Sequence, residues 1–216
     1  QDDWYVSAFQ GTGSNSLVVK DLEIPAHRYL SLMGLLKHDT PGITNNYTGW
    51  LHKAEPVPVL AIALCGGAIG LGKAAKKQFM ENIQGKKVIY TDHIQTEWAS
   101  THITLGKAAS QIDAGELLIY RAADDTDRLA QAGQQMSMEM RGRIRMDCSH
   151  GVRLILEGAT ELYIAGGAAG IAIKNPMQQI SRDLHATNMH GLLLMEPSAE
   201  VYGRILLGLE ANTIII

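Results

Sequence analysis

The sequence predicts a mainly α protein, an antiparallel helical bundle preceded by a short N-terminal β segment. Apolar residues follow a helical period from about residue 57 onward. Residues typical of strands gather only in the first 24 positions. With 46% apolar and 19% charged residues in 216, the composition is that of an ordinary globular protein. It excludes collagen-like, coiled-coil and intrinsically disordered chains.

Two strands joined by a turn are expected at the N-terminus. Residues 4–9 (WYVSAF) and 16–24 (SLVVKDLEI) are rich in β-forming side chains, and GTGSNS between them has turn composition. Pro25 ends the second strand, and a short helix is expected over residues 27–36. A polar loop follows, with Pro41, Gly42, Asn45 and Asn46.

Three long helices and two shorter ones follow, at about residues 57–84, 91–125, 133–164, 176–190 and 197–209. Gly85 is a stop signal for the first, and Thr91-Asp92 is a start signal for the second. Apolar residues at spacings of 4, 7, 3 and 4 describe one face of the second helix: Ile94, Trp98, Leu105, Ala108 and Ile112. Long helices in succession favour an up-and-down bundle.

The most apolar stretch, residues 56–72, has 17 residues without a charge but includes two prolines and four glycines. It is short for a membrane span, so we expect a buried central helix and no membrane partner. Residues 1–10 carry two acids and no basic region, unlike a signal peptide.

Charge and cysteine content favour a cytoplasmic protein that binds small molecules or proteins. A net charge of −3 and a pI near 6.2 offer no basic field to nucleic acid or anionic lipid. Cys65 and Cys148 form at most one disulfide and fit free thiols in a reducing compartment. Cys65 lies in the expected buried helix, where a thiol is inert.

Metal and nucleotide motifs are weak. The run from Asp147 to His150 is a single Asp-x-x-His with no second copy, so no di-metal site is expected. His185 and His190 are five residues apart, about 140° around a helix, and therefore do not face one metal together. The glycines of residues 166–170 (GGAAG) lack a preceding strand and the dinucleotide-binding spacing.

The richest polar segment is residues 182–191 (RDLHATNMHG), at the expected end of a helix. It holds two histidines, an Arg-Asp pair and an asparagine. Histidine near a helix end can titrate near neutrality and act as an acid or base. From the residues alone, a capped helix end with exposed histidines stays open as the alternative.

Two segments carry a family resemblance. Residues 2–28 (DDWYVSAFQGTGSNSLVVKDLEIPAHR) resemble the end of the middle β domain of the acyl-CoA dehydrogenase superfamily, where a G-x-x-G-T/S-G-S turn leads into a strand ending Val/Ile-Pro. Residues 162–191 (LYIAGGAAGIAIKNPMQQISRDLHATNMHG) resemble the C-terminal bundle of its oxygenase branch, the two-component flavin-dependent monooxygenases. The resemblance covers essentially the whole chain but only the C-terminal half of the family's length.

The resemblance implies a domain division and a fragment. Residues 1–28 would be the end of the middle β domain, and residues 29–216 the C-terminal helical-bundle domain. Family members form tetramers built on this bundle, so the resemblance also implies a homo-oligomer. We therefore expect a piece of a longer oxygenase.

The oxygenase resemblance also implies the chemistry. In that branch a histidine lies over the flavin, and His190 matches it. The resemblance implies that a separate flavin reductase delivers reduced flavin (FMN or FAD), which reacts with O2 to hydroxylate an aromatic, phenolic substrate. A neutral imidazole would take the phenol proton or hydrogen-bond the reacting oxygen. Dehydrogenase members whose catalytic Glu lies in this segment place it where this chain has Gly191, which argues against thioester dehydrogenation, although other dehydrogenases carry that Glu on another helix.

Other site residues follow from the same resemblance. Gly166 and Gly167 match a Gly-Gly that approaches the flavin of a neighbouring subunit, and Ser14 matches a turn near the flavin. We expect Arg182 and Asp183 to contribute to cofactor binding, with His185 and Asn188 behind the site.

One position departs from the family's pattern. The family often has an Arg before the glycine that ends the first bundle helix, where it contacts the flavin phosphate. Here Glu81, Asn82 and Gln84 precede Gly85. Lys86 or Lys87 is the available substitute, and the choice between FMN and FAD stays open.

Two other function classes remain at this point. An acyl-CoA dehydrogenase-like oxidoreductase or an N-oxygenase shares the fold. A non-catalytic oligomerisation bundle is the third reading.

Overall fold

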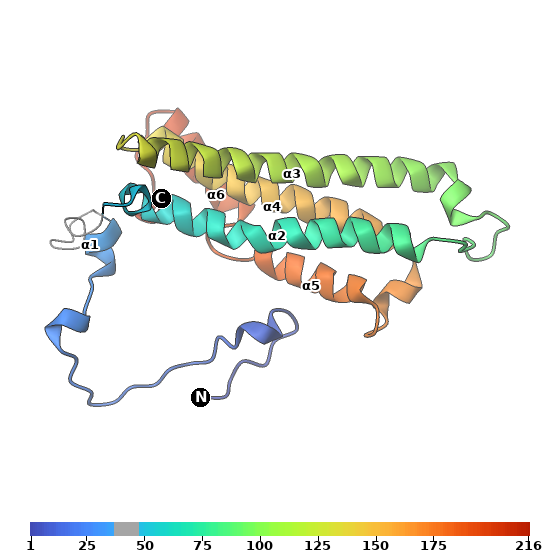
Figure 1. The fold of residues 1–216 in the computed structure, drawn as a ribbon, viewed down its shortest axis with the longest axis horizontal. Helices are drawn as coiled ribbons and strands as arrows, with labels where there is room; N and C mark the ends of the chain where they lie inside the picture. The colour runs from blue at the N-terminus through green and yellow to red at the C-terminus, as the bar shows by residue number, and fades with distance from the viewer. Residues whose placement is uncertain (37–47) are drawn as a thin grey trace.

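The computed structural model describes residues 1–36 and 48–216. Its α-helices are Leu32–Leu36 (α1), Pro56–Asn82 (α2), Ala99–Gln131 (α3), Met138–Ala165 (α4), Pro176–Asn188 (α5) and Met195–Leu206 (α6). The long helices α2, α3 and α4 run side by side, and the shorter α5 and α6 pack against them (Figure 1). The predicted helical bundle is confirmed.

Local signals explain most helix ends. Pro56 occupies the first turn of α2, and Gly85 beyond its end has φ +64°, a conformation that glycine adopts without strain. The Ser137 side chain accepts a hydrogen bond from Met140 N (3.2 Å) at the start of α4. Asn175 does the same for Met177 N (3.0 Å) at the start of α5. Four of the five predicted bundle helices are therefore confirmed with modest shifts of their ends.

The predicted start of the second long helix is wrong. Thr91 and Asp92 belong to a tight turn, in which Thr91 Oγ1 donates to Val88 O (3.0 Å) and Tyr90 has φ +63°. An isolated antiparallel bridge between Lys87 and Ile94 closes this turn. Because the turn satisfies those polar groups, α3 begins only at Ala99 and continues to Gln131. Ile94 and Trp98, expected on its apolar face, lie before it.

Helices α3 and α4 touch backbone to backbone. A Cβ atom on Gly115 would lie 2.4 Å from Gly151 O, and one on Gly151 would lie 2.7 Å from Gly115 O. Glycine is required at both positions because any side chain would separate the helices. The core of the bundle contains fully buried apolar side chains of α2, α3, α4 and α5, among them Phe79, Ile112, Ile144, Val152, Ile155, Leu162 and Leu184.

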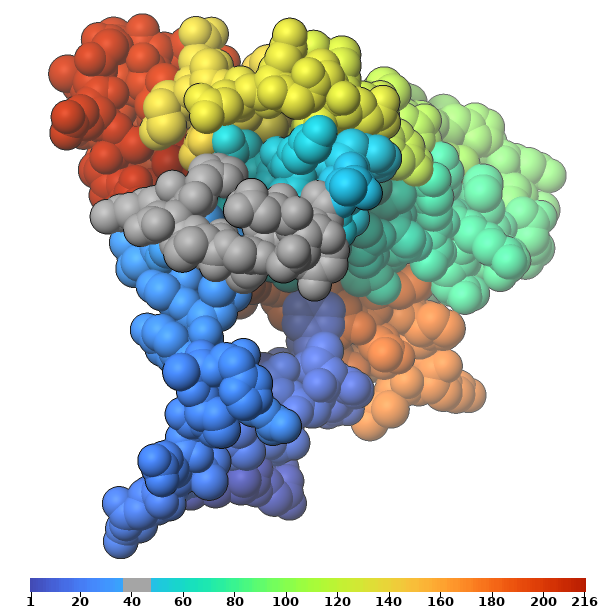
Figure 2. All heavy atoms as spheres, turned by 60° about the vertical axis from the view of Figure 1, so that its left-hand side comes forward, coloured from blue at the N-terminus to red at the C-terminus, as the bar shows by residue number. Residues whose placement is uncertain are grey.

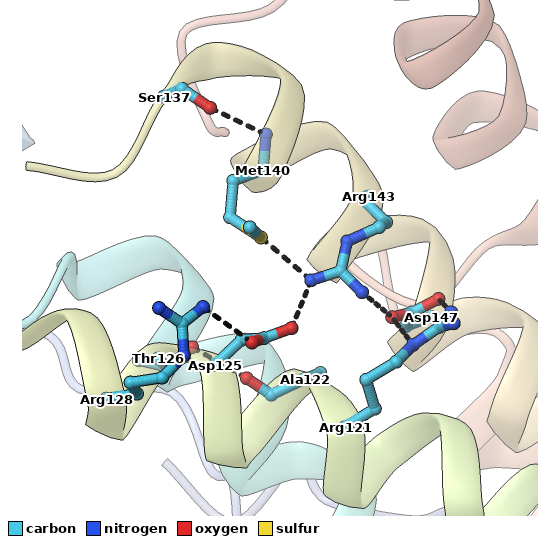
Figure 3. Close-up of polar contacts among 9 residues, drawn as sticks. All are labelled: Arg121, Ala122, Asp125, Thr126, Arg128, Ser137, Met140, Arg143 and Asp147. Atoms are coloured by element: carbon cyan, nitrogen blue, oxygen red, sulfur yellow. Dashed lines mark hydrogen bonds and ion pairs between the residues drawn. The ribbon is translucent and has the colours of Figure 1, made fainter.

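A layer of ion pairs also joins α3 to α4 (Figure 3). Arg121 Nη2 lies 2.5 Å from Asp147 Oδ1, and Arg143 binds both Asp125 and Asp147. The hydrogen bonds of Arg128 and Arg143 hold the pKa of Asp125 below its ordinary value. The Asp147 carboxylate of the Asp-x-x-His motif is thus engaged by arginines.

The two predicted N-terminal strands do not form. Within residues 1–36 and 48–216, no strand is present, and the only bridge is the one at Lys87. A strand needs a continuous ladder of backbone hydrogen bonds with a neighbour. Ser16 contacts residues 1 and 3, where Gln1 N donates to Ser16 O (2.8 Å) and Ser16 N donates to Asp3 Oδ1 (2.8 Å), but no ladder continues beyond it, and Asp21 interrupts the segment with φ +52°. Leu17 and Leu22 are accordingly 90% and 65% exposed.

The predicted turn between those segments is confirmed. Gly13 has φ +56°, and the Asn15 side chain accepts hydrogen bonds from Asp3 N (3.2 Å) and Trp4 N (3.1 Å). The short helix expected over residues 27–36 is reduced to a 3-10 turn, Ala26–Arg28, and to α1. The predicted loop with Pro41, Gly42, Asn45 and Asn46 lies outside the described residues.

Helix α2 forms as predicted, but its burial is one-sided. Among the described residues it is the one helix whose length and hydropathy suffice to cross a membrane, a test that core helices of soluble proteins also pass. Only 33% of its most apolar window is buried. Val57, Cys65 and Phe79 face the core, whereas Leu60 is 54% exposed.

Candidate functional site

The loop before the GTGSNS turn docks on α5. Asp183 Oδ1 accepts a hydrogen bond from Phe9 N (2.9 Å), and the Arg182 guanidinium donates to Ser7 O. Phe9 has φ +54°, a strained conformation for a residue with a side chain. Trp4 Nε1 donates to the Phe9 carbonyl (3.0 Å) and supports the same conformation. The Arg-Asp pair therefore fixes the shape of this loop.

A cavity of about 530 Å³ lies between the loop and α5. Arg182 and Asp183 line it together with Ser7, Ala8, Phe9, Gln10, Gly11, Thr12, Ile173, Gln178 and Gln179. Ser14 lies just beyond, with its hydroxyl 3.2 Å from Thr12 Oγ1. The structure thus brings three of the predicted site residues to one place. Their binding of a cofactor stays a prediction.

His190 lies in the turn that follows α5. Its Nδ1 accepts a hydrogen bond from Leu192 N (3.2 Å), and its carbonyl accepts from Leu193 N (2.7 Å) and Leu194 N (3.0 Å). Because Nδ1 accepts, a neutral imidazole at this position carries its proton on Nε2. The side chain is exposed, so the turn presents an Nε2–H donor outward.

Asn188 and His185 differ from each other in their surroundings. Asn188 Oδ1 is buried and has no hydrogen-bond partner within the described part of the chain. A buried acceptor without a hydrogen bond costs folding free energy unless a donor reaches it. His185 Nδ1 lies 2.7 Å from Ser181 O, and its ring lines a separate surface groove with Gln111 and Thr160. The structure therefore does not bring His185 to the loop cavity.

Gly166 and Gly167 end α4 at the far end of the bundle. Lys86 Nζ donates to Gly166 O (2.5 Å), and Gln95 Nε2 donates to Ala165 O (2.7 Å). These two side chains satisfy carbonyls that a helix end leaves unpaired, and the ammonium also suits the negative end of the helix dipole. Gly167 has φ +75°, so its backbone requires glycine.

Of the two lysines proposed to replace the family's Arg, Lys86 is the better placed. Lys87 is exposed and lies 3.5 Å from Asp92. Lys86 retains donors beyond the one given to Gly166. It lines a cavity of about 170 Å³ with Phe79, Asn82, Tyr163, Gly166, Ala169, Gly170, Asn175 and Met177.

The predicted site residues therefore fall into separate groups within one chain. Gly166 and Gly167 precede α5, whereas His190 follows it, and a helix of 13 residues is roughly 20 Å long. A compact reacting centre in a single chain therefore cannot contact both ends of α5.

The thiols have a structural role. Cys65 and Cys148 are free and fully buried. A hydrogen bond with Cys65 and burial raise the pKa of Cys148 far above its ordinary value, which leaves it unreactive. In the parts of the chain that the structure describes, no group of three or more His, Cys, Asp or Glu residues could hold a metal ion.

Two residues that contact the candidate site segments were not predicted: Gln95 donates to Ala165 O, and Arg145 donates to Gly191 O (3.4 Å). The sequence predicts that Gln95 lies on a helix, but α3 begins only at Ala99, and no motif marks Gln95 as a partner of α4. Arg145 is one of several arginines on α4, and periodicity alone does not separate it from Arg141 or Arg143.

Comparison with known proteins identifies the fold family. The family model described as acyl-CoA dehydrogenase, C-terminal domain, matches residues 62–194. This chain belongs to that family. XiaF from Streptomyces, solved with FADH2 and glycerol, superposes on the acyl-CoA dehydrogenase-like bundle with a TM-score of 0.91 and 28% identity over 99% of this chain and 54% of XiaF.

Curated relatives lie in the oxygenase branch. The oxygenase subunit HsaA of a flavin-dependent monooxygenase from Mycobacterium tuberculosis is 28% identical over 97% of this chain and 53% of HsaA. Its crystal structure matches with a TM-score of 0.87. The oxygenase component of an FADH(2)-dependent resorcinol hydroxylase from Rhizobium is 24% identical over 97% of this chain and 53% of that protein. The acyl-CoA dehydrogenase-like chain thus spans about half the length of the curated relatives it matches.

Proposed function

We propose that this chain is the helical part of the oxygenase component of a two-component flavin-dependent monooxygenase, which uses reduced flavin and O2 to hydroxylate a small phenolic substrate. The observation that carries the proposal is the outward Nε2–H of His190, fixed by the bond from Leu192 N. The similarity to HsaA and the resorcinol hydroxylase supports the reaction class.

The residues present fit a flavin. Buried Asn188 Oδ1 needs an N–H or O–H donor, which a reduced flavin or a phenol offers. Bound reduced flavin supplies the electrons that activate O2. Ser14, Arg182 and Asp183 would line one flavin site. Gly166, Gly167 and Lys86, at the other end of α5, would contact the flavin of a neighbouring subunit.

His190 acts in this proposal as a hydrogen-bond donor through Nε2. With Nδ1 accepting from Leu192 N, Nε2 of the neutral imidazole already carries the ring proton and has no lone pair free to take another. A donor next to the reacting oxygen stabilises the charge that develops there. Leu193, fully buried behind the turn, helps to keep water out.

The proposal includes a flavin reductase as partner and a cytoplasmic location, which the two buried, free thiols fit. It also includes self-association, up to a tetramer. The outward face of α2 carries no charge from Leu60 to Gly70 and presents Ala63, Gly66 and Gly67. Leu117 of the adjacent α3 is 69% exposed. A second copy of the same apolar face is the occupant that matches its chemistry.

Self-association is tested on this face. Replacing Gly67→Glu in the complete oxygenase places a charge in the middle of the α2 surface. Sedimentation velocity is expected to show a smaller particle than the unmodified protein. An unchanged sedimentation coefficient would remove the α2 face from the interface.

The His190 role is tested with three variants of the complete oxygenase, supplied with reduced flavin and a phenol. His190→Ala should lower the hydroxylation rate about 10²-fold. His190→Gln, whose amide keeps a donor, should retain more activity than His190→Ala. The control His185→Ala should leave the rate near that of the unmodified enzyme. Equal losses in the Ala and Gln variants would favour a base, and unchanged product per flavin in His190→Ala would refute any role.

A further inference from the structure

Arg145, in the N-terminal third of α4, is a buried cation without a carboxylate partner among the described residues. The residue is 8% exposed, and burial lowers the pKa of its guanidinium. Within the described residues, no Asp or Glu lies at ion-pair distance from it, whereas Arg141 and Arg143 on the same helix pair with Glu55 and with Asp125 and Asp147. A buried charge is costly unless polar groups surround it. Its acceptors are therefore the groups that stabilise Arg145.

Those acceptors come from three separate segments. Arg145 Nε donates to Ser198 Oγ of α6 (3.3 Å), one terminal nitrogen donates to Ile215 O, and the other donates to Gly191 O (3.4 Å). Ile216 is buried beside the start of α2, where it lines a small cavity with Arg145. One side chain thus ties the turn after α5, helix α6 and residues 215–216 together.

The bond to Gly191 reaches His190 through one peptide group. Gly191 O and Leu192 N belong to the same planar peptide unit. Arg145 donates to its oxygen, and its N–H donates to His190 Nδ1. Donation to the oxygen polarises the unit and strengthens its N–H as a donor. It also fixes the plane, and with it the direction of the N–H.

We propose that Arg145 is a positioning residue for His190: it holds the Gly191–Leu192 peptide so that Nδ1 of the imidazole accepts and Nε2–H faces outward. The seating of residues 215–216 supports this arrangement because Ile215 O is another acceptor of the same guanidinium. The proposal rests on the function proposed above for His190. It adds a residue that touches neither flavin nor substrate.

The test uses the complete oxygenase with Arg145→Met and Arg145→Lys. In Arg145→Met, hydrogen exchange of the peptide covering residues 190–194 should become at least about tenfold faster. Product formed per flavin oxidised should fall by between about 10-fold and 10²-fold, with KM for the phenol nearly unchanged, because the reacting geometry is lost while the substrate pocket remains. Arg145→Lys should restore part of both properties. Ile216→Ser, which unseats the tail and leaves Arg145 in place, should give a smaller change of the same kind.

The matched control is Arg143→Met, which removes an arginine with several contacts from the same helix without touching the turn. Equal effects in Arg143→Met and Arg145→Met would overturn the proposal, since general destabilisation would then explain both. Unchanged hydrogen exchange at residues 190–194 in Arg145→Met would also overturn the proposal. If Arg145→Met does not fold, hydrogen exchange at residues 190–194 and product per flavin oxidised are measured in Arg145→Lys and Ile216→Ser instead, and these two variants test the proposal. If His190→Ala lowers product yield and Arg145→Met does not, the positioning role is wrong. If neither lowers it, the function proposed for His190 fails instead.

Discussion

Helices α3 and α4 meet backbone to backbone at Gly115 and Gly151, whereas residues 1–30 meet the rest of the molecule through a few polar contacts with α5. In Figure 2 these N-terminal residues project from the bundle and approach it at the stretch that contacts α5. The first region is held by burial and the second by hydrogen bonds. Changes in the first should therefore cost global stability, and changes in the second should cost local order.

The largest effect is expected at the helix crossing. Gly115→Ala places a methyl group 2.4 Å from Gly151 O and should lower the free energy of unfolding by about 3 kcal/mol or more. Gly106→Ala, on the same helix with no atom near its Cβ, should raise it by about 0.5–1 kcal/mol. Urea unfolding of the two variants measures the contrast. Similar free energies of unfolding for both variants would mean that α3 and α4 can move apart at little cost in free energy.

A smaller effect, with a defined pH dependence, is expected from the ion pairs of Figure 3. Arg128 and Arg143 lower the pKa of Asp125 in the folded state. This stabilisation is present above the unfolded pKa, near 3.8, and is lost as the pH falls through the lower folded pKa. Asp125→Asn should cost about 1 kcal/mol at pH 7 and flatten the acid side of the stability curve.

The control for that experiment is Asp124→Asn, because Asp124 is the exposed neighbour of Asp125. It should change stability by less than about 0.5 kcal/mol at any pH. If stability falls at acid pH in Asp125→Asn just as it does in the unmodified protein, other carboxylates are responsible for the pH dependence.

The loop contact should respond locally. Asp183→Ala removes the acceptor of Phe9 N and should speed hydrogen exchange and proteolysis in residues 5–12. Global stability should change by no more than about 1 kcal/mol, since the bundle core is untouched. Gln179→Ala, which lines the same cavity, is the control. A cooperative loss of the whole fold in Asp183→Ala would show that loop and bundle unfold as one unit.

The smallest effect on stability is expected in the exposed segment. Leu17 is 90% exposed, so Leu17→Ser should change the free energy of unfolding by less than about 0.5 kcal/mol. Light scattering of the 216-residue chain should nevertheless decrease, because an exposed apolar side chain has been removed. A large loss of stability would mean that Leu17 is packed in solution.

The sequence predicted the bundle well because helices depend on local signals. Gly85, Asn175 and Pro176 act within a few residues of the helix ends that they define. The prediction of strands at residues 4–9 and 16–24 was wrong because a strand needs a neighbouring strand to pair with, and a local sequence pattern does not show whether one is present.

The candidate site shows the same division. The segment from Arg182 to Gly191 stood out by composition, and His190 does lie in a turn with a defined hydrogen bond. The partners of that segment could not be predicted. Asp183 reaches Phe9, which is 174 residues away in the chain, and Arg145 reaches Gly191, 46 residues away.

The short connection between α3 and α4 has a kinetic consequence. Residues 132–137 join the two helices, so their extensive interface closes with little loss of chain entropy, whereas α5 must find α2 across about a hundred residues. The α3–α4 hairpin is therefore expected to form in the folding transition state, with φ-values near 1 on both sides of Gly151 and near 0 in α5 and α6. The turn that carries His190 would then be among the last parts to assemble and the first to open.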